Sequence, residues 1–128
     1  MGHGDTQALA LSPDGHILAA QGPGQTLWLW DVATRRPLRE LKGSAEWMGA
    51  LVFSPDARTV LAGAFDGRLK FYNLACGVEV TSIQAHRSIC QSISITPDGT
   101  RVVTAGVDDA IKVWFAPTFD EIDKPAEQ

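Results

Sequence analysis

An all-β fold made of repeated sheets is the class that the sequence predicts, and three observations predict it. Two landmarks recur at a constant interval of 42 residues: Pro13, Pro55 and Pro97 in a Ser/Thr-Pro-Asp turn, and the aromatic residues Trp30, Tyr72 and Trp114. A shared period at two independent landmarks indicates three copies of one structural unit. The third observation is that no segment sustains a helical period of 3.6 residues over ten positions.

The first two strands of each unit flank the Pro-Asp turn. Apolar first strands are expected at residues 8–11, 50–53 and 92–95. In the turn, proline presets φ, aspartate bonds nearby backbone and glycine accepts a positive φ. Second strands are expected at 17–20, 60–64 and 102–105. They are apolar on both faces, which is typical of strands covered on each side.

The third and fourth strands complete each unit. Third strands are expected at 27–30, 69–72 and 111–114, after a turn rich in glycine and aspartate. Fourth strands are expected near 38–41 and 78–83, and residues 118–122 could supply one to the third unit.

Composition limits the functions open to the chain. Its 128 residues suit one domain with a substantial core. A net charge of −4 lacks the basic field of non-specific nucleic-acid binding, and no apolar run is long enough to span a membrane. Two cysteines, Cys76 and Cys90, are too few for a disulfide scaffold, so we expect free thiols in the cytoplasm. We therefore expect neither nucleic acid nor membrane as a partner.

The repeats resemble those of the WD-repeat β-propeller family over nearly the whole chain. The signature dipeptide is intact as Trp30-Asp31 and degenerate as Tyr72-Asn73 and Trp114-Phe115. The glycine-histidine signature is also degenerate, as Gly2-His3, Gly43-Ser44 and Ala85-His86. The resemblance implies three four-stranded antiparallel blades in a single propeller segment. Its boundaries are repeat one at 1–43, repeat two at 44–85, repeat three at 86–122 and an acidic tail at 123–128.

The resemblance also implies a buried polar network in the third blade. It would consist of His86, Thr104, Asp108 and Trp114. The same histidine, threonine and aspartate could be interpreted as a hydrolase triad, but threonine would then have to be an exposed nucleophile. His86 and Cys90, four residues apart, are too few for a metal site. We expect neither a cofactor nor catalysis.

A partner-binding surface is expected where the resemblance places the top face of the propeller. The candidate residues are Trp47, Phe65, Ile89, Val107 and Arg87. The four apolar residues occupy equivalent repeat positions in pairs, and tryptophan is enriched at binding hot spots. Trp47 could instead fold back onto its blade as a lid. Trp28, which replaces a lysine of the other repeats, fits an interblade contact, an intersubunit contact or a sheltered core position.

Three functions remain open after these steps. The leading hypothesis is a non-catalytic scaffold that presents the top face to a protein or peptide. The alternatives are a regulatory or sensor segment of a larger, possibly enzyme-linked protein, and a metal-dependent propeller hydrolase. Closed propellers use about four to eight blades. One chain supplies three blades, so we also expect a homodimer in which two chains close as a six-bladed ring.

Overall fold

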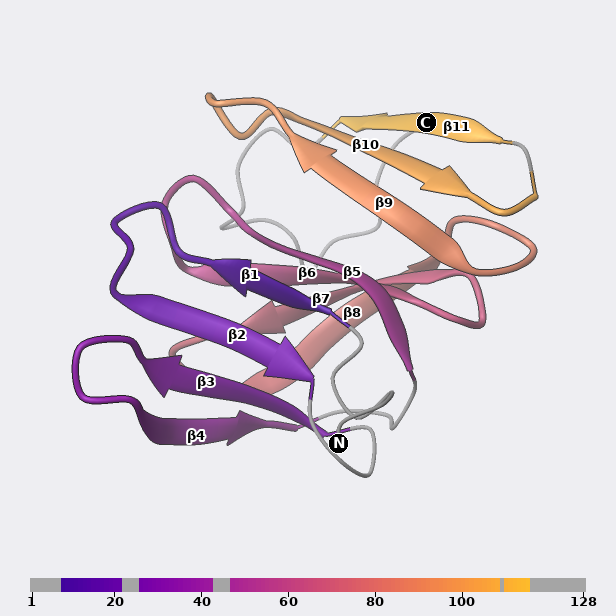
Figure 1. The fold of residues 1–128 in the computed structure, drawn as a ribbon. Coiled ribbons are helices and arrows are strands. Elements are labelled where there is room, and N and C mark those ends of the chain that lie inside the picture. The colour runs from indigo at the N-terminus through magenta and orange to yellow at the C-terminus, as the bar shows by residue number, and fades with distance from the viewer. Residues whose placement is uncertain (1–7, 22–25, 43–46, 109, 116–128) are drawn as a thin grey trace.

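The computed structural model describes residues 8–21, 26–42, 47–108 and 110–115. Within these residues the regular secondary structure consists of β-strands alone (Figure 1). Blade one contains β1 (Leu9–Leu11), β2 (Ile17–Gln21), β3 (Leu27–Asp31) and β4 (Arg36–Leu41). Blade two contains β5 (Met48–Phe53), β6 (Thr59–Ala64), β7 (Arg68–Asn73) and β8 (Val78–Gln84). Blade three contains β9 (Cys90–Ile95), β10 (Arg101–Gly106) and β11 (Ile111–Phe115).

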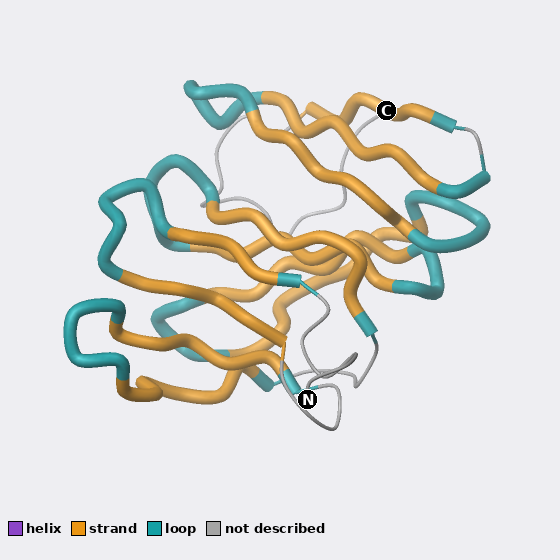
Figure 2. The backbone as a smooth tube through the Cα atoms, viewed as in Figure 1, coloured by secondary structure: helices purple, strands orange, loops and turns teal. Residues whose placement is uncertain are grey.

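Each blade is an antiparallel sheet whose strands pair in chain order, so the all-β propeller class is confirmed. The fourth strand expected at 118–122 lies outside the described residues, as do Gly2-His3 and Gly43-Ser44. The sheet of blade two lies between those of blades one and three, with β1 against β5 and β5 against β9 (Figures 1 and 2). Among the described residues, none forms a helix with the length and hydropathy that crossing a membrane requires.

The Ser/Thr-Pro-Asp turn has the same hydrogen bonds in every blade. In blade one, Ser12 Oγ donates to Asp14 Oδ1 at 2.6 Å and accepts the amide of Ile17 at 3.0 Å. Ser54 and Thr96 repeat both contacts in the other blades. The repeated hydroxyl and carboxylate therefore close the turn between the first two strands.

The core is divided between the two blade interfaces. Blades one and two bury Leu27 and Leu29 against Tyr72 and its neighbours. Blades two and three bury Leu69 and Phe71 in a second cluster that includes Val102. All six residues of β6 are buried, as predicted for a strand covered on both faces.

Glycine allows blade three to approach blade two closely. A Cβ at Gly63 would lie 2.7 Å from the carbonyl oxygen of Cys90 and 2.8 Å from its Sγ. Cys90 is buried and unpaired, and burial raises the pKa of its thiol to about 11. The thiol is therefore a packing group in this interface, because the reactive form is the thiolate.

Candidate functional site

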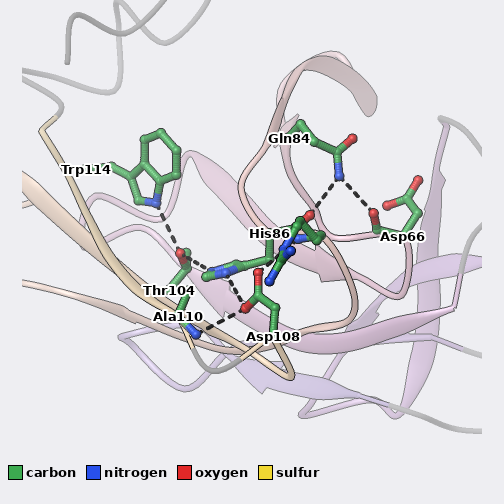
Figure 3. Close-up of polar contacts among 8 residues, drawn as sticks. Asp66, Gln84, His86, Thr104, Asp108, Ala110 and Trp114 are labelled. Atoms are coloured by element: carbon green, nitrogen blue, oxygen red, sulfur yellow. Dashed lines mark hydrogen bonds and ion pairs between the residues drawn. The ribbon is translucent and has the colours of Figure 1, made fainter.

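The structure brings together the four residues of the expected polar network (Figure 3). His86 comes from the loop between β8 and β9, Thr104 from β10, Asp108 from the turn after β10, and Trp114 from β11. Trp114 Nε1 donates to Thr104 Oγ1 at 3.1 Å, and Thr104 Oγ1 lies 2.8 Å from His86 Nε2. His86 Nδ1 lies 3.1 Å from Asp108 Oδ1.

The groups at the two ends of the network, a donor at Trp114 and an acceptor at Asp108, determine the direction of its hydrogen bonds. An ionised carboxylate can only accept, so the proton between His86 and Asp108 belongs to His86 Nδ1. In the neutral imidazole Nε2 then accepts the hydroxyl proton of Thr104, whose oxygen accepts from Trp114. Each buried polar group of the network has a partner in this arrangement.

Asp108 also holds the backbone of the loop that enters blade three. Its Oδ2 accepts the amide of Arg87 at 3.0 Å, and its Oδ1 accepts the amide of Ala110 at 3.2 Å. The Arg87 amide makes the largest contribution to holding the pKa of Asp108 below its ordinary value, with desolvation opposing it. The carboxylate thus fixes the loop that carries exposed Arg87.

A second set of contacts joins this loop to the neighbouring turn of blade two. Gln84 Nε2 donates to the carbonyl oxygens of Asp66 and His86, both at 2.9 Å. The carbonyl of Gly67 accepts the amides of Ala85 and His86. Gly67 has φ +90°, and a Cβ there would overlap the carbonyl of His86, so only glycine fits. These bonds join the two turns into one unit.

The apolar candidates lie in pairs at the same end of blades two and three. The amide of Phe65 donates to the carbonyl of Trp47 at 2.8 Å, and the amide of Val107 donates to that of Ile89 at 3.0 Å. Phe65 is 38% exposed and Val107 is 50% exposed, whereas Trp47 and Ile89 are half-buried. We call these four residues with Arg87 the rim cluster. Two adjacent blades therefore present accessible apolar side chains at matching positions.

The geometry also bears on the chemistry open to the polar network. The Thr104 side chain is fully buried, and its hydroxyl is engaged by both His86 and Trp114. A nucleophile needs access to substrate, which this hydroxyl lacks. In the part of the chain that the structure describes, no three His, Cys, Asp or Glu side chains are grouped to hold a metal ion.

Sequence reasoning missed the polar side chains that connect blades. Gln84 is one, and Gln21, whose Oε1 accepts the Met48 amide at 2.8 Å, is another. Arg39 donates to three carbonyl oxygens of the β7–β8 turn, at 3.2–3.3 Å. The period gave no signal for the two glutamines, because the other repeats have different residue types at these positions.

The chain matches the family model described as WD domain, G-beta repeat, at residues 35–73 and 77–114. The first match spans β4 to β7 and the second spans β8 to β11, so each covers the outer strand of one blade and three strands of the next. The repeat of the family model is therefore offset by one strand from a blade.

Three curated relatives match most of the chain. Protein groucho of Drosophila melanogaster is 32% identical over 110 residues, which are 84% of this chain and 15% of that protein. Transcription factor unc-37 of Caenorhabditis elegans is 27% identical over 114 residues, 89% of this chain and 19% of that protein. Transducin-like enhancer protein 2 of Mus musculus is 36% identical over 106 residues, 81% of this chain and 14% of that protein. The chain thus spans less than a fifth of each relative.

Proposed function

The chain belongs to the WD-repeat family, and from this premise we propose that it is a non-catalytic scaffold whose rim cluster binds a protein or peptide partner. The observation that carries the proposal is the repeated pairing at the rim. Phe65 and Val107 are exposed at equivalent positions of neighbouring blades, and each is held by a backbone bond to the residue that directly precedes the first strand of its blade. Exposed apolar side chains that cluster are typical of interaction sites.

Preorganisation of the rim supports the proposal. The network from Trp114 to Asp108 and the bonds of Gln84 fix the turn after β6 and the loop that enters blade three, which carry Phe65 and Arg87. A surface that is rigid before binding loses less conformational entropy when a partner docks. Exposed Arg87, two residues before Ile89, adds a cation to the rim cluster, so the partner we expect carries an apolar anchor and an acidic group.

Affinity measurements with matched variants test this function. A partner captured by the wild-type chain is titrated calorimetrically against Phe65→Ala, Trp47→Ala and Val78→Ala. Val78 is 39% exposed on the outer strand of blade two, which matches the exposure of Phe65. We expect at least about a tenfold loss of affinity for both rim variants, the effect of removing a hot-spot side chain, and no change for Val78→Ala. Equal affinities for all three variants would contradict the proposal.

The proposed setting is the cytoplasm, with the chain as a homodimer that binds neither nucleic acid nor membrane. The net charge of −4 supports the absence of nucleic acid, and the two unpaired thiols support a reducing compartment. Fluorescence microscopy of a tagged chain, with a salt-dependent nucleic-acid binding assay, tests this setting. A nuclear signal or retention on DNA would contradict it.

The second candidate is a regulatory or sensor segment of a larger WD-repeat protein. It is favoured by the length of the relatives, in which the matched segment makes up 14–19% of the protein. Under this candidate the rim cluster would bind another domain of the same protein. Cross-linking followed by mass spectrometry in cell extracts distinguishes the two candidate functions. The second candidate predicts cross-links from the rim cluster to the chain's own polypeptide, whereas the scaffold predicts cross-links to a different protein.

A further inference from the structure

Each blade has two apolar faces, and the contacts within the chain show what covers each kind. The forward face of a blade packs on the next blade: Leu27 and Leu29 of blade one are 3% and 4% exposed, and Leu69 and Phe71 of blade two are 0% and 4% exposed. The backward face packs on the preceding blade. In blade two it includes Phe53, Val60 and Tyr72, which are 0–5% exposed.

No described residue covers the forward face of blade three. Ile111 and Val113 stand one repeat after Leu69 and Phe71, yet they are 76% and 53% exposed. Phe115 on the same strand is 59% exposed, and strand register adds Val103 to the face. An apolar face that is buried in two blades and exposed in the third indicates a missing neighbour.

The backward face of blade one is likewise left open by the part of the chain that the structure describes. Strand register places Leu9 with Trp28, and Leu11 with Leu18 and Trp30, on this face. Leu9 and Leu11 are 61% and 56% exposed, whereas the tryptophans are half-buried. Trp28 stands where the other repeats have lysine, so it makes this face more apolar than its equivalents.

We propose that a second copy of the chain covers both faces, with blade three of each copy packed on blade one of the other. The two uncovered faces are of opposite kinds, a forward face and a backward face, which is the pairing found at both interfaces inside the chain. Two copies related by a two-fold axis satisfy both faces at once and leave none exposed. Their six blades form a ring within the usual range of four to eight. The inference rests on the homodimer of the proposed function and specifies its contacts.

Variants with charges on one face test this pairing. Leu9→Glu with Leu11→Glu blocks the face of blade one, and Ile111→Glu with Val113→Glu blocks that of blade three. All four side chains are more than half exposed, so the substitutions leave each chain folded. Val32→Glu, in a turn and 41% exposed, is the control. The full chain and its variants are compared by light scattering on a size-exclusion column and by analytical ultracentrifugation, over about 1 to 500 μM.

The forward-to-backward pairing predicts a specific pattern of masses. Wild type and Val32→Glu give about twice the 13.8 kDa of one chain, and each double variant alone gives one chain. An equimolar mixture of the two double variants gives two chains, because one unblocked face of each kind remains. Its dissociation constant is about 100-fold or more above that of wild type, since only one of two linked contacts is left.

The outcomes separate this inference from the proposed function. A wild-type dimer that persists in either double variant overturns the forward-to-backward pairing and leaves the homodimer standing. A mixture that does not associate also overturns the pairing, as does a wild-type mass of three or more chains. A wild-type chain that is monomeric at every concentration overturns the homodimer and the inference together. Partner affinity at Phe65 is measured separately and decides the scaffold function alone.

Discussion

Replacing Thr104 by valine tests how the polar network stabilises blade three. Valine keeps the shape of the side chain but removes the hydroxyl that bonds to His86 Nε2 at 2.8 Å and to Trp114 Nε1 at 3.1 Å. Two buried or half-buried polar groups then lose a partner, at about 1–3 kcal/mol each. The added apolar carbon offsets about 1 kcal/mol. We therefore expect a loss of about 3 kcal/mol in the free energy of unfolding.

Thermal and urea unfolding at one fixed protein concentration measure this loss. For a chain of this length, about 3 kcal/mol lowers Tm by about 12 °C. Thr104→Ser is the control, because it keeps the hydroxyl and loses only a methyl group, at about 1 kcal/mol. In a Trp114→Phe background Thr104→Val should cost about 1 kcal/mol less, since one of the stranded groups is already gone. Equal losses for the valine and serine variants would refute the network.

Three further predictions concern the backbone conformation of one turn, the reactivity of the two thiols and the pKa of one carboxylate. Ala57 has φ 61° where the equivalent turns have glycine, so Ala57→Gly should stabilise the chain by about 1 kcal/mol in urea unfolding. Exposed Cys76 should react with a thiol reagent in the native protein, whereas Cys90, buried and with a raised pKa of about 11, should react only after unfolding. Asp98 has a pKa lowered to about 2, chiefly by the Thr96 hydroxyl, so Thr96→Val should move that pKa back toward 3.8 in an NMR titration.

Each of these has a control and a contrary result. For the turn, Gly15→Ala should destabilise the chain, because Gly15 has φ 79°, which is unfavourable for alanine. A Cβ at this position would meet no other atom, so the backbone conformation alone causes the cost. A stability loss for Ala57→Gly would contradict the backbone argument, and equal native reactivity of the two thiols would contradict the burial of Cys90. For Asp98, the lowered pKa contributes stability above about pH 3.8 that is lost as pH falls toward 2. Thr96→Val also loses the bond to the Arg101 amide, which does not depend on pH. A stability difference between Thr96→Val and wild type that does not shrink as pH falls from about 4 to 2 would therefore contradict the Asp98 contribution.

Most of the fold could be predicted because two kinds of residue repeat with the same period. The Ser/Thr-Pro-Asp turns and the apolar strands beside them are local patterns, and local patterns are visible in a sequence. Strand starts were predicted less well: β5 and β9 begin at Met48 and Cys90, two residues earlier than expected. Each contains a bulge, at 48–50 and 90–92, and the segment from which the strand was predicted begins only at the end of that bulge.

The candidate site could be predicted only where it repeats or resembles a known pattern. Trp47 and Phe65 were found through their equivalents in blade three, and His86 through the family resemblance. Contacts between blades, such as Arg39 with the β7–β8 turn, join residues that are 35–37 positions apart. No local pattern encodes them. Lys70 is fully buried although its residue type indicates a surface position, and tertiary packing alone decides this.

Site-specific photo-cross-linking tests the central claim, that the rim cluster is the surface that binds the partner. A photoreactive amino acid is placed at Phe65 in one sample and at Val78 in another, two positions on blade two with matched exposures of 38% and 39%. With the captured partner bound, the account predicts a cross-link from position 65 and none from position 78. A cross-link from position 78 alone, or equal yields from both, would contradict it.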